Sequence, residues 1–246
     1  RSTRERFAAL LPRALAGRTW FNPRDRRIDT VRISNAAPMR IPNGPDSRIA
    51  LVEVTYTEGE PETYQLPLSY HPMGRATDDS RTRPTLFLVM SPSGSMVGVI
   101  TDAVAEPTFA HMLLDVIRRR RHITQNSNDL VGLVGRTGRD VLTGPLQDLS
   151  CSPNREAVRN SAVIFGDRFF LKVYRRVETG VNPEWEIGRF LTDRTDFHNA
   201  VATYGTVELR GRGRTTRTLG VLQQQVTHER DAWEYVLDKF GAYQED

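Results

Sequence analysis

The stretch IFGDRFFLKVYRR, residues 164–176, constrains the fold of this chain most strongly. Its alternation predicts a strand with Phe170, Lys172 and Tyr174 on one face and apolar residues on the other. Lys172 and Lys239 are the two lysines among 34 basic residues, and the rest are arginines. A lysine inside an apolar strand is a candidate point charge for an anionic partner. The alternative is an edge lysine whose stem covers apolar surface while its head reaches water.

The segments around this strand follow a defined order. We predict strands at 162–165 and 168–175 joined by a turn, a helix at 183–194, strands at 204–210 and 218–226, and a helix from 231. This is the order of the small lobe of a protein-kinase-like fold. In that lobe a strand lysine holds the α- and β-phosphates of ATP, and a glutamate on the next helix holds the lysine.

The predicted helix has a clear beginning in NPEWEIGRFL. Asn182 can cap it, and Pro183 suits its first turn. We expect Ile187, Phe190 and Leu191 to face the core.

Two acids in the first turn compete as partners for Lys172. Glu184 is the expected partner because it lies beside the expected inward stripe, and Glu186 is the second choice. Both could instead be acids that favour the helix dipole. Before the first strand, Asn160 and Ser161 could donate hydrogen bonds to phosphates, or form an ordinary turn, because no glycine-rich G-x-G-x-x-G is present.

The first part of the chain has a different pattern. We expect a short amphipathic helix at 5–15 and a curved, mainly antiparallel sheet over residues 20–100, with hairpin turns at TEGEP and SPSGS. A helix at about 106–121 follows. The Gly-, Asn- and Ser-containing stretch 123–157 is the best candidate for a domain boundary or linker, with short strands inside it.

At this point the sequence resembles the bacterial maltokinases, which make maltose 1-phosphate from ATP and maltose. The resemblance rests on RNSAVIFGDRFFLKVYRRVETGVNPEWEIGRFLTD and LGVLQQQVTHERDAWEYVLD, and on LPRALAGRTWFNPRDRRIDTVRI and LVEVTYTEGEPETYQLPL near the N-terminus. It implies an α+β fold with an antiparallel-sheet cap domain at 1–105 and a protein-kinase-like small lobe, with intermediate segments, at 106–230. Residues 231–246 would begin the first helix of a C-terminal catalytic lobe that is absent from this chain.

The resemblance also implies roles for particular residues. Lys172 would bind phosphate with Glu184, or alternatively Glu186, as its partner, and Asn160 and Ser161 would lie in the phosphate loop. The backbone of a hinge segment would face adenine; it comprises Gln223, Gln224, Gln225 and Val226. Asp231 and Trp233 would begin the next helix. Two departures concern phosphate and nucleotide contacts: Ala157, Val158 and Arg159 replace the family's Glu-Gln-Ser, and the hinge QQQVTHERD differs from the usual pattern.

The implied cofactors are ATP and Mg²⁺, with the metal ligands in the absent lobe. The implied reaction belongs to the trehalose-to-glycogen pathway, and a trehalose synthase domain or subunit is an implied partner. A kinase of another sugar, such as glucosamine, is one alternative, and a non-catalytic cap and pseudo-lobe module associated with trehalose synthase is another. No histidine precedes Gly-Asp, as the family's catalytic loop requires, so we assign no catalytic or metal residue here and expect this chain alone to be inactive.

Composition argues against other classes. The net charge of +4 invites a nucleic-acid role, but the arginines are interleaved with acids, and RGRGRTTR at 210–217 is typical of an exposed hairpin tip rather than an RNA-binding tail. No apolar run approaches the roughly 18 residues of a membrane span. The single Cys151 fits a reducing, cytoplasmic setting. The chain begins at Arg1 without a signal-peptide pattern, and we expect a fragment of a longer protein.

Overall fold

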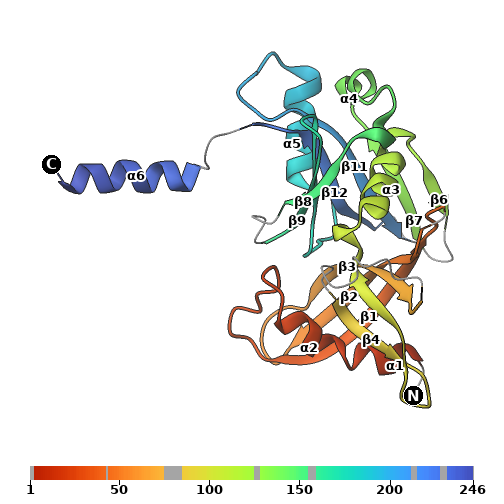
Figure 1. Cartoon of the computed structure of the whole chain (residues 1–246). Helices are drawn as coiled ribbons and strands as arrows, with labels where there is room; N and C mark the ends of the chain where they lie inside the picture. The colour runs from red at the N-terminus through yellow and green to blue at the C-terminus, as the bar shows by residue number, and fades with distance from the viewer. Residues whose placement is uncertain are drawn as a thin grey trace.

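The computed structural model describes residues 3–42, 44–74, 85–124, 128–154, 159–211, 215–227 and 232–245. Two antiparallel sheets make up most of it, one below the other in Figure 1. The elements are α1 (Thr3–Ala8), α2 (Leu11–Ala16), β1 (Ile28–Met39), β2 (Asp46–Tyr56), β3 (Glu62–Pro72), β4 (Thr85–Met90), β5 (Met96–Asp102), the 3₁₀ turn η2 (Ala103–Ala105), α3 (Pro107–Arg118), β6 (His122–Thr124), β7 (Asn128–Val134), α4 (Arg136–Val141), the 3₁₀ turn η3 (Leu146–Asp148), β8 (Cys151–Asn154), β9 (Ser161–Phe165), β10 (Phe169–Val173), α5 (Pro183–Arg194), β11 (Thr203–Gly211), β12 (Thr216–Gln224) and α6 (Ala232–Glu245).

The first sheet has five strands in the order β1-β2-β3-β5-β4, all antiparallel, which confirms the sheet predicted for this region. Its β2 strand buries Val52 and Val54 on the face that packs against α1 and α2, together with Leu11 and Leu15 from α2. The single helix expected at 5–15 is divided into α1 and α2. Pro12 explains the division, because proline suits the first turn of a helix and not its interior.

The second sheet has seven strands in the order β6-β7-β11-β12-β10-β9-β8. The stretch 123–157 was expected to be a boundary or linker with short strands inside it; the short strands are present, but they belong to this sheet, so the linker expectation was wrong. Within it β7 pairs with β11 along seven residue pairs, and β8 pairs with β9 at the other end of the sheet. Its glycines permit close packing rather than flexibility: at Gly132 a side chain would collide with the backbone of Val116 in α3.

One hydrophobic core joins the two sheets. Helix α3 packs on β7 and β11 of the seven-stranded sheet. Its buried side chains, such as Phe109 and Ile117, belong to the same cluster as Met39 and Ile49 of the five-stranded sheet. The two sheets are therefore held together by burial of apolar surface as well as by polar contacts.

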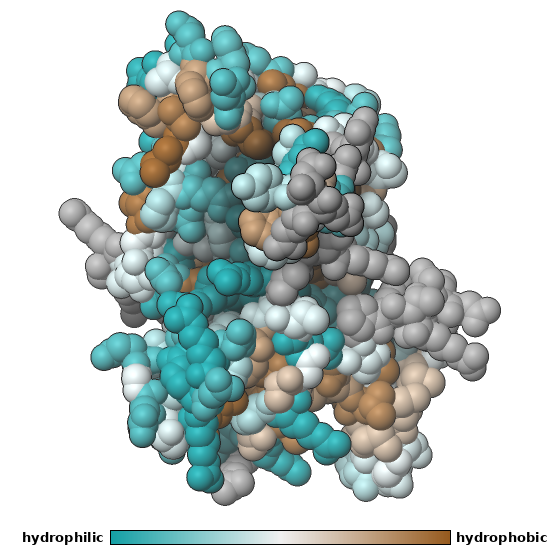
Figure 2. All heavy atoms as spheres, turned by 90° about the vertical axis from the view of Figure 1, so that its left-hand side faces the viewer, coloured by the Kyte–Doolittle hydropathy of each residue, from teal (hydrophilic) through white to brown (hydrophobic). Residues whose placement is uncertain are grey.

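Helix α6 differs from the rest of the molecule, because it projects away from both sheets (Figure 1). Its apolar side chains are exposed, including Trp233, Leu237 and Phe240. Figure 2 views the molecule from the side on which α6 projects and shows hydrophilic residues gathered along the junction between the two sheets. In the described part of the chain, no helix is both long and apolar enough to cross a membrane.

Candidate functional site

Lys172 lies in the middle of β10, and its side chain meets α5. Its Nζ atom donates to both carboxylate oxygens of Glu184, at 2.8 Å to Oε2 and 3.2 Å to Oε1. The side chains are 29% and 32% exposed, so the pair is partly buried and open to solvent on one side. The strand alternates as expected, because Phe169, Leu171 and Val173 are buried. The ion pair predicted from the sequence is therefore present.

A tyrosine stabilises the carboxylate of this pair. Tyr174 OH donates to Glu184 Oε2 at 2.7 Å and approaches Asn182 Oδ1 at 3.3 Å. Burial raises the pKa of Tyr174 well above its usual range, and the hydrogen bond and nearby charge of the Glu184 carboxylate raise it further. The phenol thus remains a hydrogen-bond donor to the Glu184 carboxylate.

Helix α5, which carries Glu184, packs on the sheet through a different face from the one expected. Its start is as predicted, with Asn182 Oδ1 accepting from the amides of Glu184 and Trp185. The expected inward stripe was wrong, because Ile187 and Phe190 are exposed. The helix instead buries Trp185 and approaches β11 through small residues, so that a side chain at Gly188 would collide with Thr203 Oγ1.

Glu186, the second choice for the lysine partner, lies elsewhere. It lines a pocket with Arg189, Asp193 and residues of α4 rather than contacting Lys172. In that pocket Asp193 accepts hydrogen bonds from the backbone amides of Arg136 and Thr137, at 2.8 and 2.9 Å. Burial opposes ionisation of Asp193, but these bonds outweigh it and lower its pKa. Asp193 is therefore a cap that holds α4 against α5.

The hinge segment forms one wall of a pocket of about 560 Å³ beside β10. The pocket is lined by the four predicted hinge residues and by apolar side chains that include Ile164, Phe170 and Val201. The amides of Gln224 and Gln225 donate to Ala202 and Arg168 carbonyls. Within the part of the chain that the structure describes, the amide of Val226 has no acceptor. This pocket thus offers apolar walls and an open backbone donor.

Asn160 and Ser161 lie at the start of β9, and their side chains are directed to Arg175. Asn160 Oδ1 accepts from the Arg175 amide at 3.3 Å, and Ser161 Oγ accepts from Arg175 Nε at 2.8 Å. Two of the departures from the family pattern, Ala157 and Val158, lie outside the described residues, as does Asp231. Helix α6 begins at Ala232.

Arg175 is a central residue that the sequence reasoning did not single out. Its side chain is 2% exposed, and its Nη2 donates to Asp102 Oδ2 of the first sheet at 2.5 Å. Its guanidinium also lies over the ring of Trp20, 4.8 Å from the centroid. The signal was present in the alternation, which places residue 175 on the same inward face as Phe169 and Leu171. A buried arginine at such a position requires an acidic partner.

Backbone bonds extend this junction. The amide of Gln65 donates to Arg175 O at 2.7 Å, and the amide of Val177 donates to Thr63 O at 2.9 Å. The Gln65 side-chain amide donates to Tyr174 O at 3.1 Å and Leu219 O at 3.2 Å. Strand β3 of the first sheet is therefore bonded to the segment that directly follows Lys172.

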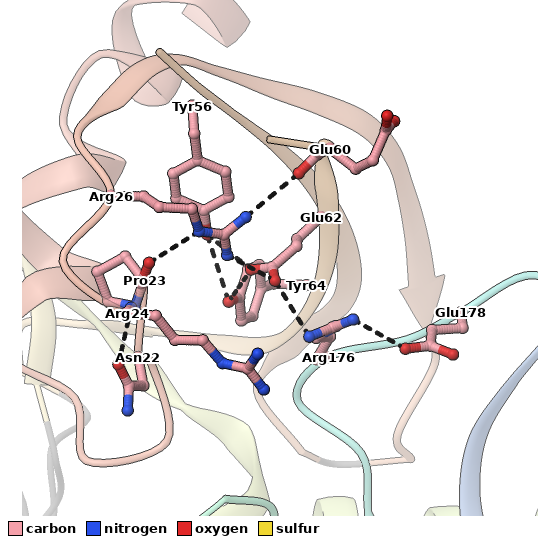
Figure 3. A network of polar contacts seen from close by, with 10 residues as sticks. All are labelled: Asn22, Pro23, Arg24, Arg26, Tyr56, Glu60, Glu62, Tyr64, Arg176 and Glu178. Carbon is pink, nitrogen blue, oxygen red and sulfur yellow. Dashed lines mark hydrogen bonds and ion pairs between the residues drawn. The ribbon is translucent and has the colours of Figure 1, made fainter. Parts of the chain in front are cut away.

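A second polar network lies beside this junction (Figure 3). Arg26 and Arg176 both pair with Glu62, at 2.7 and 3.1 Å, and Tyr56 and Tyr64 donate to Glu62 Oε2. Burial would raise the pKa of Glu62, but the hydrogen bonds from the two tyrosines and Arg26, with the charge of Arg176, lower it. Within the described residues, no group of three or more His, Cys, Asp or Glu could hold a metal ion.

Comparisons with known proteins concern the first sheet and the overall fold. Residues 15–105 match the family of the maltokinase N-terminal cap domain. The structure of a glucosamine kinase in complex with glucosamine, ADP and inorganic phosphate has a similar fold, with a TM-score of 0.51 and 13% identity over 97% of this chain. Crystal form B of glucosamine kinase gives a TM-score of 0.50 at 14% identity, also over 97% of this chain.

The chain spans 44% of the length of each of these two glucosamine kinase chains. At such low identity the likeness concerns the fold alone. Residues 15–105 are thus similar to a maltokinase N-terminal cap domain, and the fold of the whole chain is similar to part of a kinase-like protein.

Proposed function

We propose that this chain is the cap and nucleotide-binding part of an ATP-dependent sugar kinase. The observation that carries the proposal is the alignment of three features along one face of β10 and the residue that follows it. Phe170 lines the hinge pocket, Lys172 follows with its Glu184 partner, and Tyr174 holds that partner. In kinase-like folds this arrangement places adenine at the hinge and the α- and β-phosphates at the lysine.

The residues present fit a nucleotide. Adenine is flat and apolar with a hydrogen-bonding edge, which suits the walls at Ile164 and Phe170 and the open amide of Val226. Lys172, held by Glu184, would neutralise phosphate charge. Bound ATP supplies the phosphoryl group that is transferred. Phosphoryl transfer also requires Mg²⁺ ligands and a base for the sugar hydroxyl, and we assign neither to this chain.

We assign residues 1–105 to the cap, 106–230 to the small lobe and 231–246 to the start of a further helix. The cap match supports maltose as the acceptor, with maltose 1-phosphate as the product in a trehalose-to-glycogen pathway. The fold likeness to glucosamine kinase supports glucosamine as the alternative acceptor. The exposed apolar face of α5, with Ile187 and Phe190, and the exposed side chains of α6 are surfaces that a second lobe would cover.

A second candidate function is a non-catalytic cap and pseudo-lobe that docks on a trehalose synthase domain or subunit. The observation that favours it is that Asn160 Oδ1 and Ser161 Oγ both accept hydrogen bonds from Arg175, which ties these side chains to the junction with the first sheet. Retention of the Lys172–Glu184 pair and of the open hinge amide favours the kinase.

A thermal melt with nucleotide separates the two candidates. The melting temperature of the chain should rise with millimolar ADP or ATP–Mg²⁺, because ligands that bind the folded state stabilise it. Lys172→Ala should abolish most of this rise, whereas Lys239→Ala, which changes the other lysine on the exposed helix α6, should preserve it. A melt that is indifferent to nucleotide in the unaltered chain would favour the docking module instead.

A further inference from the structure

A second pocket lies at the junction of the two sheets and shares no lining residue with the hinge pocket. We call it the junction pocket. Its volume is about 650 Å³, within the range of sites for small molecules. Thr19, Trp20, Asn22, Arg24 and Tyr64 of the cap form one side, and the segment 176–183, which includes the start of α5, forms the other.

The lining of the junction pocket is rich in unneutralised positive charge. Arg24, Arg159 and Arg176 all line it. Arg176 is paired with Glu62 and with Glu178, the acidic residue of the lining. Arg24 and Arg159 have no ion-pair partner among the residues that the structure describes. In Figure 3 the Arg24 side chain extends beside Arg176, and no dashed line reaches its guanidinium.

The backbone at Arg24 is held in an uncommon conformation. Arg24 and Asp25 have φ angles of 53° and 64°, in the left-handed region that residues other than glycine rarely adopt. The amide of Arg24 donates to Asn22 Oδ1 at 2.9 Å, which fixes this turn. Such conformations are concentrated at functional sites, and here the conformation directs a cation toward a neighbouring cation.

A buried hydroxyl provides an independent indication of a ligand. Thr218 lines the junction pocket and is 3% exposed, yet its Oγ1 has no hydrogen-bond partner within the described part of the chain. Buried polar atoms are normally satisfied, so a ligand that reaches Thr218 would supply a missing hydrogen bond. Trp20, whose ring also lines the pocket, offers a partly exposed aromatic surface.

We propose that the junction pocket binds a phosphorylated sugar as a second ligand, separate from the nucleotide at the hinge. Arg24 and Arg159 would hold the phosphate, because planar guanidinium groups bind phosphate oxygens through paired hydrogen bonds. Thr218 Oγ1 would bond a sugar hydroxyl, and Trp20 would cover an apolar face of the ring. The ligand would touch both domains and so would stabilise the junction between them.

Isothermal titration of the chain with glucose 1-phosphate tests this proposal. We expect saturable binding that is at least about tenfold weaker in the double variant Arg24→Gln/Arg159→Gln, because each lost charge-assisted bond is worth that factor or more. Arg6→Gln, which removes an exposed arginine of α1 outside the pocket lining, should bind like the unaltered chain.

Three results would overturn the proposal. One is absence of saturable binding up to about 10 mM, which corresponds to an affinity too weak for a built site. Another is equal weakening in Arg6→Gln and in the double variant, which would show general charge attraction. The last is inorganic phosphate binding as tightly as glucose 1-phosphate, which would leave no role for Trp20 and Thr218. Melts of each variant without ligand establish that it is folded.

Discussion

The buried ion pair between Asp102 and Arg175 makes the strongest energetic prediction. Asp102→Asn keeps the size of the side chain and keeps an oxygen for the Val104 amide, which now donates to Asp102 Oδ1 at 3.2 Å. The substitution removes the negative charge 2.5 Å from the Arg175 guanidinium and replaces the Oδ2 acceptor by an NH2 donor. The side chains of the pair are 2% and 9% exposed, so water cannot replace the lost partner.

Removing one member of a buried pair typically costs about 3–5 kcal/mol, because the other charge stays buried without compensation. We expect that loss here, since Ser161 Oγ and the Trp20 ring are the remaining side-chain partners of Arg175. Equilibrium unfolding in urea measures it: at a slope of about 3 kcal/mol/M the midpoint should fall by about 1 M or more.

The exposed pair between Arg32 and Glu53 is the matched control, with side chains 65% and 36% exposed. Glu53→Gln should cost less than about 1 kcal/mol. Equal small losses for Asp102→Asn and Glu53→Gln would refute the argument that the cap is fixed to β10 through a buried charge.

Three further predictions concern other contacts. The folded-state pKa of Glu62 lies below its ordinary value, so its contribution to stability is present above about pH 4.5 and is lost as the pH falls through the folded-state pKa. Glu62→Gln should therefore flatten the dependence of the urea midpoint on pH between about 5 and 3. An unchanged profile would contradict this. Asp193→Ala should lower stability by about 0.5–2 kcal/mol in the same assay, because the cap of α4 is lost. Gly188→Ala should displace α5 from Thr203 and thereby reduce the nucleotide-dependent rise in melting temperature, whereas Gly241→Ala in α6, where a side chain meets open space, should not.

The sequence was sufficient for the parts of the fold that depend on local patterns. Alternation predicted β10 and its buried face, and the Asn-Pro pair predicted the beginning of α5, because both signals act within a few residues. The Lys172–Glu184 contact followed from element order together with the family resemblance.

The errors arose where tertiary packing overrode local pattern. Periodicity placed Ile187 and Phe190 inside, but α5 packs through Gly188 because Thr203 leaves no room for a larger residue. The stretch 123–157 was expected to be a linker because glycine and asparagine are common in loops, yet Gly132 is the residue that lets β7 lie against α3. Long-range partners such as Asp102 for Arg175 are 73 residues apart, and no local pattern indicates them.

The central claim, that nucleotide binds along one face of β10, is tested most directly by amide chemical-shift mapping of the ¹⁵N-labelled chain with ADP. The account predicts the largest shifts at Val226 and along β10 at Phe170 and Lys172, with a small effect at Gly135 beside the Glu186 pocket. A spectrum without shifts at Val226 and Lys172 at saturating ADP would contradict it.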